Sequence, residues 1–290
     1  MGQLKQLKNQ ILQKENQQKP ILYDVFYRDD SIPKSVIIFS HGFKGFKDWG
    51  FFNYMAAFFA RRNFVFVKFN FSHNGTTPQQ PEDFADLTAF SENTYSQELS
   101  DLNSVIDFVQ SPDFLAKCPD LNLKPRQLCL MGHSRGGSMS IIKAAEDNRV
   151  KALCTLSAVG DLLNRWPEEQ LKEWKEKGVY TIANARTGQQ MPMKYDIVED
   201  MLSQRNRFDI YDLCKRINIP FLLIHGTEDE AVRYEEALHM KSLNKDIKLS
   251  LCPGAGHTLG GKHPMEGDQP PAILQDVLAQ VLAFFREVDK

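Results

Sequence analysis

The chain has 290 residues, of which 42% are hydrophobic and 25% are charged, as in an ordinary globular protein. Its formal net charge of −2 provides no field that would attract nucleic acid or an anionic membrane surface, so neither is an expected partner. No apolar stretch approaches the roughly 18 residues of a membrane span, and the length suits one large α/β domain with an insertion or two small domains.

The N-terminal segment, residues 1–19, is rich in Gln, Lys and Asn and lacks the apolar core of a signal peptide. Leu4, Leu7 and Ile11 have helical spacing, so we expect either a frayed helix or disorder here, and no function. The five cysteines are odd in number and form no C-x-x-C pair, which favours a reducing compartment over a disulfide scaffold. We therefore expect a cytoplasmic protein.

From residue 20 onward, short apolar runs rich in β-branched and aromatic residues alternate with helical segments. Continuous runs such as Val36-Ile37-Ile38-Phe39 are typical of strands buried on both faces. Strands that alternate with helices predict an α/β fold, with a mostly parallel sheet and helices on both of its faces. The predicted strands are Ile21–Tyr27, Val36–Ser40, Phe64–Phe71, Leu128–Met131, Ala152–Ser157, Phe221–His225 and Lys248–Cys252.

Two amphipathic helices are predicted with particular clarity from their apolar stripes. One carries Leu99, Leu102, Ile106 and Val109 at helical spacing. The other follows Pro270-Pro271, which suit a helix start, and ends the chain. Its stripe is formed by Ile273, Val277 and Val281 with Leu274, Leu278 and Leu282 beside them.

Residues 161–216 interrupt the alternation, because they form a long, mixed stretch without a convincing buried strand. Loops this long are uncommon and often functional, and ligands of open α/β folds bind at the carboxyl edge of the sheet. We expect a cap inserted after the fifth or sixth strand, between core segments 20–160 and 217–290; an ordinary crossover with a long loop is the alternative. Four apolar residues of the cap are candidates for the substrate pocket or simply for the core: Trp166, Trp174, Tyr180 and Met191.

The pentapeptide Gly132-His133-Ser134-Arg135-Gly136 lies between an apolar strand and a helical segment. In this strand, turn and helix context, G-x-S-x-G is typical of a nucleophile elbow with Ser134 at its apex. Gly132 and Gly136 remove Cβ atoms that would clash in so sharp a turn, and the helix N-terminus favours negative charge near the serine. The pattern alone is weak evidence, so the chain must also supply a base, an acid and an oxyanion hole.

An acid and a base follow the elbow in the order that this arrangement requires, which is serine, acid and then histidine. The predicted strand Phe221–His225 runs into Asp229, with Glu228 and, less well placed, Glu230 as competitors. The next predicted strand runs into a Gly-rich loop that carries His257. Both positions are expected at the sheet edge that holds the elbow, so we predict that Asp229 is the acid and His257 the base.

The remaining histidines have structural interpretations. His225 ends a strand and is expected to pack or to bond locally, and His133 is expected to pack at the elbow. His239 and His263 are expected at the surface, in a helix and in a loop. His73 follows a strand and is left open between a pocket-lining and a structural role.

An oxyanion hole requires two preorganised N–H donors. One is expected from Arg135, the residue after the nucleophile, and the other from the loop that follows an early buried strand. That loop is His41-Gly42-Phe43-Lys44-Gly45, and we predict the Phe43 N–H as its donor; a plain glycine turn is the alternative. The side chains of Arg135 and Lys44 are expected to be solvated, with contact to an acidic group of the substrate as the alternative.

Together these motifs resemble the α/β-hydrolase superfamily over roughly residues 21–288. Within it, Ser40-His41-Gly42-Phe43-Lys44-Gly45 and the insertion pattern Leu171-x-x-Trp174-x-x-x-Gly178 with Arg186-Thr187-Gly188-Gln189 look like the feruloyl (cinnamoyl) esterase branch. Dienelactone-hydrolase-like and prolyl-oligopeptidase-like catalytic domains are its relatives. The resemblance implies serine-dependent hydrolysis through an acyl-enzyme, without a metal or other cofactor. A dienelactone hydrolase uses cysteine where this chain has Ser134, and the propeller domain of the peptidases is absent, which disfavours those two activities.

The sequence thus predicts a hydrolase that cleaves carboxylic esters of small acyl groups, with a small-molecule ester as its partner. Amide, peptide or thioester hydrolysis on the same triad is one alternative. A catalytically inactive scaffold that binds a small ligand or a partner is another, because fold does not dictate function. An aromatic acyl group is a further hypothesis, and neither the physiological substrate nor the oligomeric state follows from the sequence.

Overall fold

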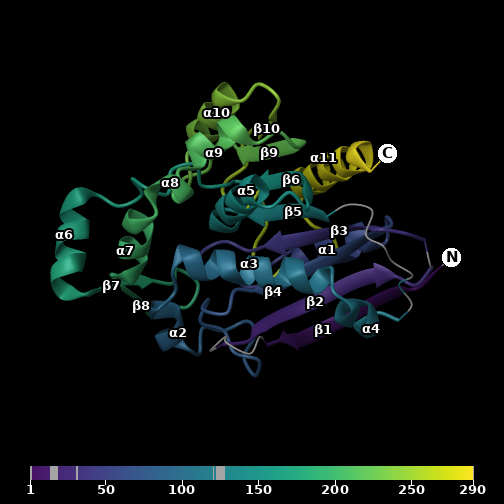
Figure 1. Cartoon of the computed structure of the whole chain (residues 1–290), viewed down its shortest axis with the longest axis horizontal. Coiled ribbons are helices and arrows are strands. Elements are labelled where there is room, and N and C mark those ends of the chain that lie inside the picture. Colours follow the sequence, from purple (N-terminus) through teal and green to yellow (C-terminus); the bar gives the residue numbers. More distant parts are fainter. Residues whose placement is uncertain (1, 14–18, 31, 120, 122–127, 290) are drawn as a thin grey trace.

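A computed structural model describes residues 2–13, 19–30, 32–119, 121 and 128–289. An eight-stranded sheet runs through the molecule (Figure 1). In spatial order its strands are β1 (Leu4–Leu12), β2 (Ile21–Arg28), β4 (Phe64–Asn70), β3 (Ser35–Ser40), β5 (Leu128–His133), β6 (Val150–Leu156), β9 (Phe221–Gly226) and β10 (Lys248–Cys252). The strands from β4 to β10 in this order pair in parallel, whereas β1 and β2 pair antiparallel with their neighbours. The predicted, mostly parallel sheet is confirmed.

Helices cover both faces of the sheet, as expected. Successive strand residues point to opposite faces, so alternate residues belong to two separate apolar clusters, and helices pack on each cluster. On one face lie α1 (Phe52–Ala60) and α11 (Ala272–Val288). On the other lie α3 (Tyr95–Val109), α5 (Arg135–Glu146), α9 (Ile210–Arg216) and α10 (Tyr234–Leu243). The predicted stripes of α3 and α11 face these clusters. The short helices α2 (Leu87–Ser91) and α4 (Pro112–Lys117) precede and follow α3 in the chain.

The expectation of a frayed helix or disorder at the N-terminus is wrong for residues 4–12, which form the strand β1. Residues 14–18, to which the expectation also applied, lie outside the described residues. Leu4 and Leu7 are three residues apart, so a strand places them on opposite faces, and they pack against different apolar clusters. A bulge follows Leu7, where Asn9 has a φ of 53°. In a regular strand, Leu7 and Leu12 would lie on opposite faces because they are five residues apart. The extra residue of the bulge shifts the alternation of faces by one, so both pack against the same apolar cluster.

Residues 161–216, which we call the cap, follow β6. They form α6 (Glu168–Lys177), a hairpin of β7 (Val179–Ala183) and β8 (Gln190–Lys194), then α7 (Asp196–Ser203), α8 (Arg205–Phe208) and α9. The hairpin is a separate two-stranded sheet whose β8 lies beside α2 (Figure 1). Its tip lies near the carboxyl end of β5, because residues 184–186 line the same cavity as Ser134.

Two further findings concern the whole of the described chain. No helix in the described residues has the length and apolar character needed to cross a membrane. The five cysteines are all free and buried.

Candidate active site

The elbow is a sharp turn in which β5 passes directly into α5 through Ser134. Ser134 has φ 54° and ψ −126°, a sparsely populated conformation of the kind that is held at functional sites. The crowding that the two glycines were expected to relieve is present: a Cβ on Gly136 would lie 2.3 Å from the His41 carbonyl oxygen, and one on Gly132 would lie 2.3 Å from that of Gly136. The Ser134 N–H donates to the Leu156 carbonyl at 2.9 Å and so fixes the turn to β6.

Asp229 and His257 follow the carboxyl ends of β9 and β10 and meet beside the elbow. The His257 Nδ1 lies 2.8 Å from Asp229 Oδ2, and the other carboxylate oxygen accepts from the N–H groups of Ala231 at 2.9 Å and Val232 at 2.8 Å. Ser134 and His257 line the same cavity. No hydrogen bond joins these two side chains within the described residues, and such bonds are often long before substrate binds.

A second imidazole, His225, also contacts the Asp229 carboxylate, at 3.2 Å from Nε2 to Oδ2. The same nitrogen lies 2.9 Å from the Val232 carbonyl, the local bond that was expected, and because both partners are acceptors it carries the proton. Burial alone would raise the pKa of Asp229, but hydrogen bonds from His225 and His257 outweigh it and hold that pKa well below its usual range. The competitors Glu228 and Glu230 are exposed.

His133 packs at the elbow, as expected, and supports the loop of the candidate base. Its Nε2 donates to the His257 carbonyl at 3.0 Å, and the two rings lie 4.9 Å apart. Burial lowers the pKa of His133 to about 3, so its ring is neutral.

The two predicted oxyanion donors belong to backbone beside Ser134, because Arg135 follows it in the chain and Phe43 lies in the loop that contacts the elbow. The loop after β3 touches the elbow so closely that a Cβ on Gly42 would lie 2.9 Å from the Ser134 Cβ. Neither the Phe43 N–H nor the Arg135 N–H donates to another group of the described residues. The geometry thus leaves both donors free beside the serine.

His41 fixes the backbone of this loop. Its Nε2 accepts from the Phe71 N–H at 3.3 Å, so Nδ1 carries the proton and donates to the Gly42 carbonyl at 2.8 Å. Burial lowers the pKa of His41 to about 4, which keeps the ring in this neutral form.

The Arg135 side chain is buried, which corrects the expectation that it is solvated. Its guanidinium donates to Glu98 Oε1 at 2.6 Å and lies 4.1 Å from the centre of the Phe43 ring. The physical reason is that Glu98 on α3 is buried and requires a counter-ion: burial raises the pKa of Glu98, and Arg135 opposes that rise.

A cavity of about 360 Å³ opens at Ser134. Aromatic rings and glycines of the β3 and α1 region form one wall, and the tip of the β7–β8 hairpin forms another. Its lining consists of Gly42, Phe43, Lys44, Gly45, Trp49, Phe52, His133, Ser134, Asn184, Ala185, Arg186, His257 and Thr258.

The four cap residues predicted as pocket candidates do not line this cavity, so that prediction is corrected. Trp174 is fully buried, its indole N–H donates to the Met193 carbonyl at 2.9 Å, and its ring packs against those of Trp166 and Tyr180. Met191 is also fully buried. These side chains belong to the apolar cluster that covers one face of the main sheet and continues into the cap, so they pack in the core and do not face the cavity.

The other histidines lie away from the reacting groups. His239 is exposed, as expected, whereas His263 is half-buried: its Nδ1 accepts from the Gly50 N–H at 2.9 Å, and burial lowers its pKa. His73 is buried, with Nδ1 2.8 Å from the Ser72 hydroxyl, and does not line the cavity.

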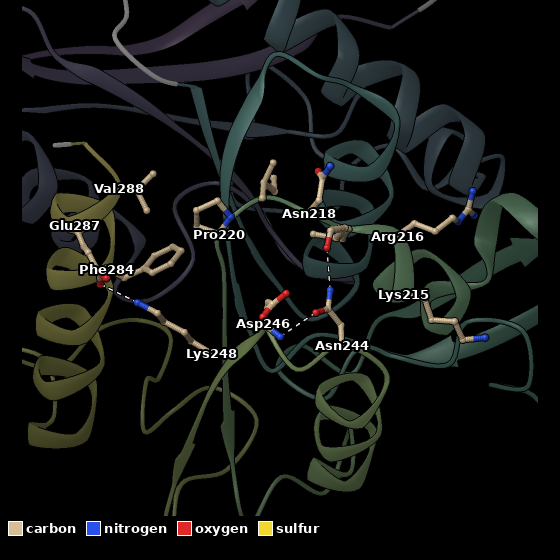
Figure 2. Close-up of a pocket in the computed structure, with 12 residues that line it drawn as sticks. Lys215, Arg216, Asn218, Pro220, Asn244, Asp246, Lys248, Phe284, Glu287 and Val288 are labelled. Atoms are coloured by element: carbon tan, nitrogen blue, oxygen red, sulfur yellow. Dashed lines mark hydrogen bonds and ion pairs between the residues drawn. The ribbon is translucent and has the colours of Figure 1, made fainter.

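A second cavity, of about 650 Å³, lies at the amino ends of β9 and β10 (Figure 2). Lys248 pairs with Glu287 there at 2.8 Å, and the Asn244 amide donates to the Ile217 carbonyl at 2.8 Å. Its described lining has no serine, histidine or cysteine. The candidate catalytic side chains therefore lie at the other end of the sheet, around Ser134.

Solved structures share this fold. The complex of ferulic acid with Est1E from Butyrivibrio proteoclasticus has a TM-score of 0.70 and 19% identity, and the similarity covers 96% of this chain and 98% of that one. Acylaminoacyl peptidase from Pyrococcus horikoshii has a TM-score of 0.64 and 17% identity, over 98% of this chain and 41% of that one. At these identities the likeness shows the fold alone, which is the α/β-hydrolase fold that the motifs predict.

Sequence comparison gives the family. The uncharacterized peptidase YuxL of Bacillus subtilis (strain 168) is 26% identical over 165 residues, which are 55% of this chain but only 23% of that protein, so the chain spans less than a quarter of this relative. The model of the prolyl oligopeptidase family matches residues 49–289, a range that includes Ser134, Asp229 and His257. The chain therefore belongs to the prolyl oligopeptidase family of α/β-hydrolases.

Proposed function

We propose that the protein is a serine-dependent hydrolase of carboxylic esters with small acyl groups. The observation that carries the proposal is the 2.8 Å hydrogen bond between His257 and Asp229 at the edge of a cavity that also exposes Ser134. A base oriented by an ionised acid, beside a serine on a strained turn, is the arrangement that activates a hydroxyl as a nucleophile.

The mechanism follows from these positions. His257 Nε2 takes the proton of Ser134 as its Oγ attacks the acyl carbonyl, and Asp229 holds the imidazole in the required tautomer and stabilises the imidazolium. The N–H groups of Phe43 and Arg135 stabilise the oxyanion. The intermediate collapses to an acyl-enzyme as His257 protonates the leaving alcohol, and water then releases the acid by the same steps.

Two features support an ester rather than a peptide as substrate. The cavity is small, at about 360 Å³, and aromatic rings of Phe43, Trp49 and Phe52 line it, which suits a compact apolar group. Peptide or amide hydrolysis is the second candidate, because the family and its relative YuxL are named for peptidases. The intact pairing of Asp229 with His257 argues against an inactive scaffold.

The test compares p-nitrophenyl acetate, an acyl thioester and a set of aminoacyl p-nitroanilides as substrates of the wild type and Ser134→Ala. We expect kcat/KM to be highest for the ester, and Ser134→Ala to lower it by about 1,000-fold or more. Higher kcat/KM on the anilides or the thioester would replace the ester assignment. No hydrolysis of any of them by the wild type would overturn the proposal.

A further inference from the structure

The cavity at Ser134 carries an unbalanced charge. Its described lining contains two cations, Lys44 and Arg186, and no carboxylate, although the chain as a whole has a net charge of −2. The two cations come from opposite walls, one from the loop after β3 and the other from the tip of the β7–β8 hairpin. A region of one sign next to apolar walls attracts a ligand of the opposite sign.

Lys44 is the less compensated of the two cations. Its Nζ donates to the Ala183 carbonyl at 3.1 Å, which bridges the two walls, and no ion pair joins it to a carboxylate of the described residues. Partial burial lowers the pKa of Lys44, because leaving water penalises the charged ammonium. A bound anion would offset that penalty, because a nearby opposite charge favours the charged ammonium.

Asn184 adds an unused donor to the same place. The residue is only 6% exposed, and its Oδ1 accepts from the Arg186 N–H at 3.1 Å, which assigns the other amide position as the NH2 group. That Nδ2 is buried and has no hydrogen-bond partner in the described residues. The Asn184 backbone is fixed by a bond to the Gln189 carbonyl at 2.9 Å. Asn184 lines the cavity, so an acceptor on a bound ligand could satisfy this buried donor.

Arg186 is held only loosely by protein groups. Its guanidinium lies 3.3 Å from the Glu82 carbonyl and 3.5 Å from the carboxylate of Asp83, whose side chain is 68% exposed. Ion pairs of this exposed kind are weak. The guanidinium therefore remains available to a carboxylate, which it binds in a planar, bidentate geometry.

We propose that the ester substrate of this site carries a carboxylate, bound beneath the hairpin tip by Lys44, Arg186 and the Asn184 amide. The inference rests on the proposed function, because it names the substrate class of the same site. The apolar part of such a substrate packs against the aromatic wall while its scissile carbonyl lies at Ser134. The carboxylate belongs either to the acyl group or to the leaving alcohol, and the experiment separates the two.

The experiment uses two matched pairs of esters. In the first pair, p-nitrophenyl hydrogen adipate carries the carboxylate on the acyl side and p-nitrophenyl methyl adipate is its neutral partner. In the second pair, p-carboxyphenyl acetate carries it on the leaving side and p-(methoxycarbonyl)phenyl acetate is neutral. We expect the wild type to have a ratio of kcat/KM, anionic over neutral, of about ten or more in one pair, as charge-assisted hydrogen bonds predict.

Three variants identify the source of that preference. Lys44→Met and Arg186→Met should each lower the anionic-to-neutral ratio by about fivefold or more, and Asn184→Leu should lower it less, because it removes a neutral donor. The matched control is Arg205→Met, which removes an exposed arginine outside the cavity and should leave the ratio unchanged. Both kcat/KM values of a ratio are measured on the same protein. Hydrolysis of the neutral ester by a variant therefore shows that the active site of that variant is folded.

The outcomes separate the inference from the function on which it rests. Suppose that the neutral esters are hydrolysed and that, in both pairs, the anionic-to-neutral ratio of kcat/KM is the same in the wild type, Lys44→Met and Arg186→Met. That result would overturn the carboxylate site but not the ester hydrolysis. Failure of the wild type to hydrolyse any of the four esters would instead overturn the proposed ester hydrolysis.

Discussion

Arg135 connects the two predicted halves of the oxyanion hole. Its N–H is one proposed donor, and its guanidinium lies 4.1 Å from the ring of Phe43, which supplies the other. Glu98 holds the guanidinium at 2.6 Å. We infer that Glu98 is a positioning residue, because it acts on the reacting groups only through Arg135.

Replacing Glu98 by glutamine tests this role. Glu98→Gln keeps the shape of the side chain but leaves Arg135 without a counter-charge, so the two N–H donors lose their alignment. We expect kcat to fall about tenfold with little change in KM, a smaller effect than the roughly 100-fold or greater loss that follows removal of an oxyanion donor. Steady-state kinetics on p-nitrophenyl acetate measure both constants.

The control for this variant is Glu169→Gln, in which the glutamate is exposed on α6. It should leave both constants unchanged. An increase in KM at constant kcat for Glu98→Gln would contradict the positioning role, because it would place Glu98 in substrate binding instead.

At the residue scale, the sequence predicts the proposed triad but not its support. Ser134, Asp229 and His257 are recognisable because each follows the end of a predicted strand, in the chain order that is typical of α/β-hydrolases. His225 is also at a strand end, four residues before Asp229, but the sequence favours local packing or bonding there and does not predict its contact with the Asp229 carboxylate. Nothing near Glu98 in the sequence predicts that it pairs with Arg135, because the two lie on different helices.

Among the elements, α3 is tied to the end of β4 by a buried carboxylate. Asp101 accepts from the Ser72 N–H at 2.7 Å and from the Gln97 amide at 2.9 Å. Burial raises the pKa of Asp101 to about 7, from an ordinary value of 3.8, although both of these hydrogen bonds oppose the rise. The folded protein therefore holds a proton between these two pH values that the unfolded chain has released.

The pH dependence of stability tests this interpretation. Because the folded state binds the extra proton, the free energy of unfolding should fall as pH rises through that window, by at most about 1.4 kcal/mol per pH unit for one group. Asp101→Asn removes the titration, so its stability should fall less steeply than that of the wild type in urea unfolding. The control Asp246→Asn, at an exposed position, should follow the wild type. Equal slopes in all three proteins would contradict the prediction.

The wrong predictions for the N-terminal segment and for the cap have one cause: the local spacing of residues does not show what they pack against in the folded chain. The spacing of Leu4 and Leu7 suits one face of a helix, but β1 places them on opposite faces of the sheet. The bulge after Leu7 also interrupts the alternation of inward and outward residues that would indicate a strand. The tryptophans of the cap, Trp166 and Trp174, were candidates for the pocket and instead pack against each other. In contrast, the stripes of α3 and α11 were predictable, because each continues over several turns of helix.

For the molecule as a whole, a buried cluster of four charges joins β2, β4 and the loop after β3. Asp24 and Lys68 are fully buried and 2.5 Å apart, and Lys68 lies 2.6 Å from Asp48. Lys47 completes the cluster at 2.9 Å from Asp24. Burial lowers the pKa of Lys68, whereas Asp24 and Asp48 oppose that change. The four buried charges balance, so the removal of Lys68 leaves two buried carboxylates that share one buried cation, Lys47.

Lys68→Met should therefore lower the free energy of unfolding by about 3–5 kcal/mol, as expected when one member of a buried ion pair is removed. Adding Asp24→Asn should recover part of the loss, because it removes the excess negative charge. Lys248→Met is the matched control: Lys248 is exposed and pairs with Glu287 at 2.8 Å, so the expected loss is below about 1 kcal/mol. Urea unfolding measures all of these, and an equal loss in Lys68→Met and Lys248→Met would contradict the account.

The central claim, that Ser134 is a nucleophile activated by His257, is tested most directly by covalent labelling. A fluorophosphonate probe should modify the wild type once, and mass spectrometry should locate it on the peptide that contains Ser134. Ser134→Ala should not be labelled, and His257→Ala should be labelled far more slowly because the base is missing. An unlabelled wild type, or equal labelling of wild type and Ser134→Ala, would contradict the claim.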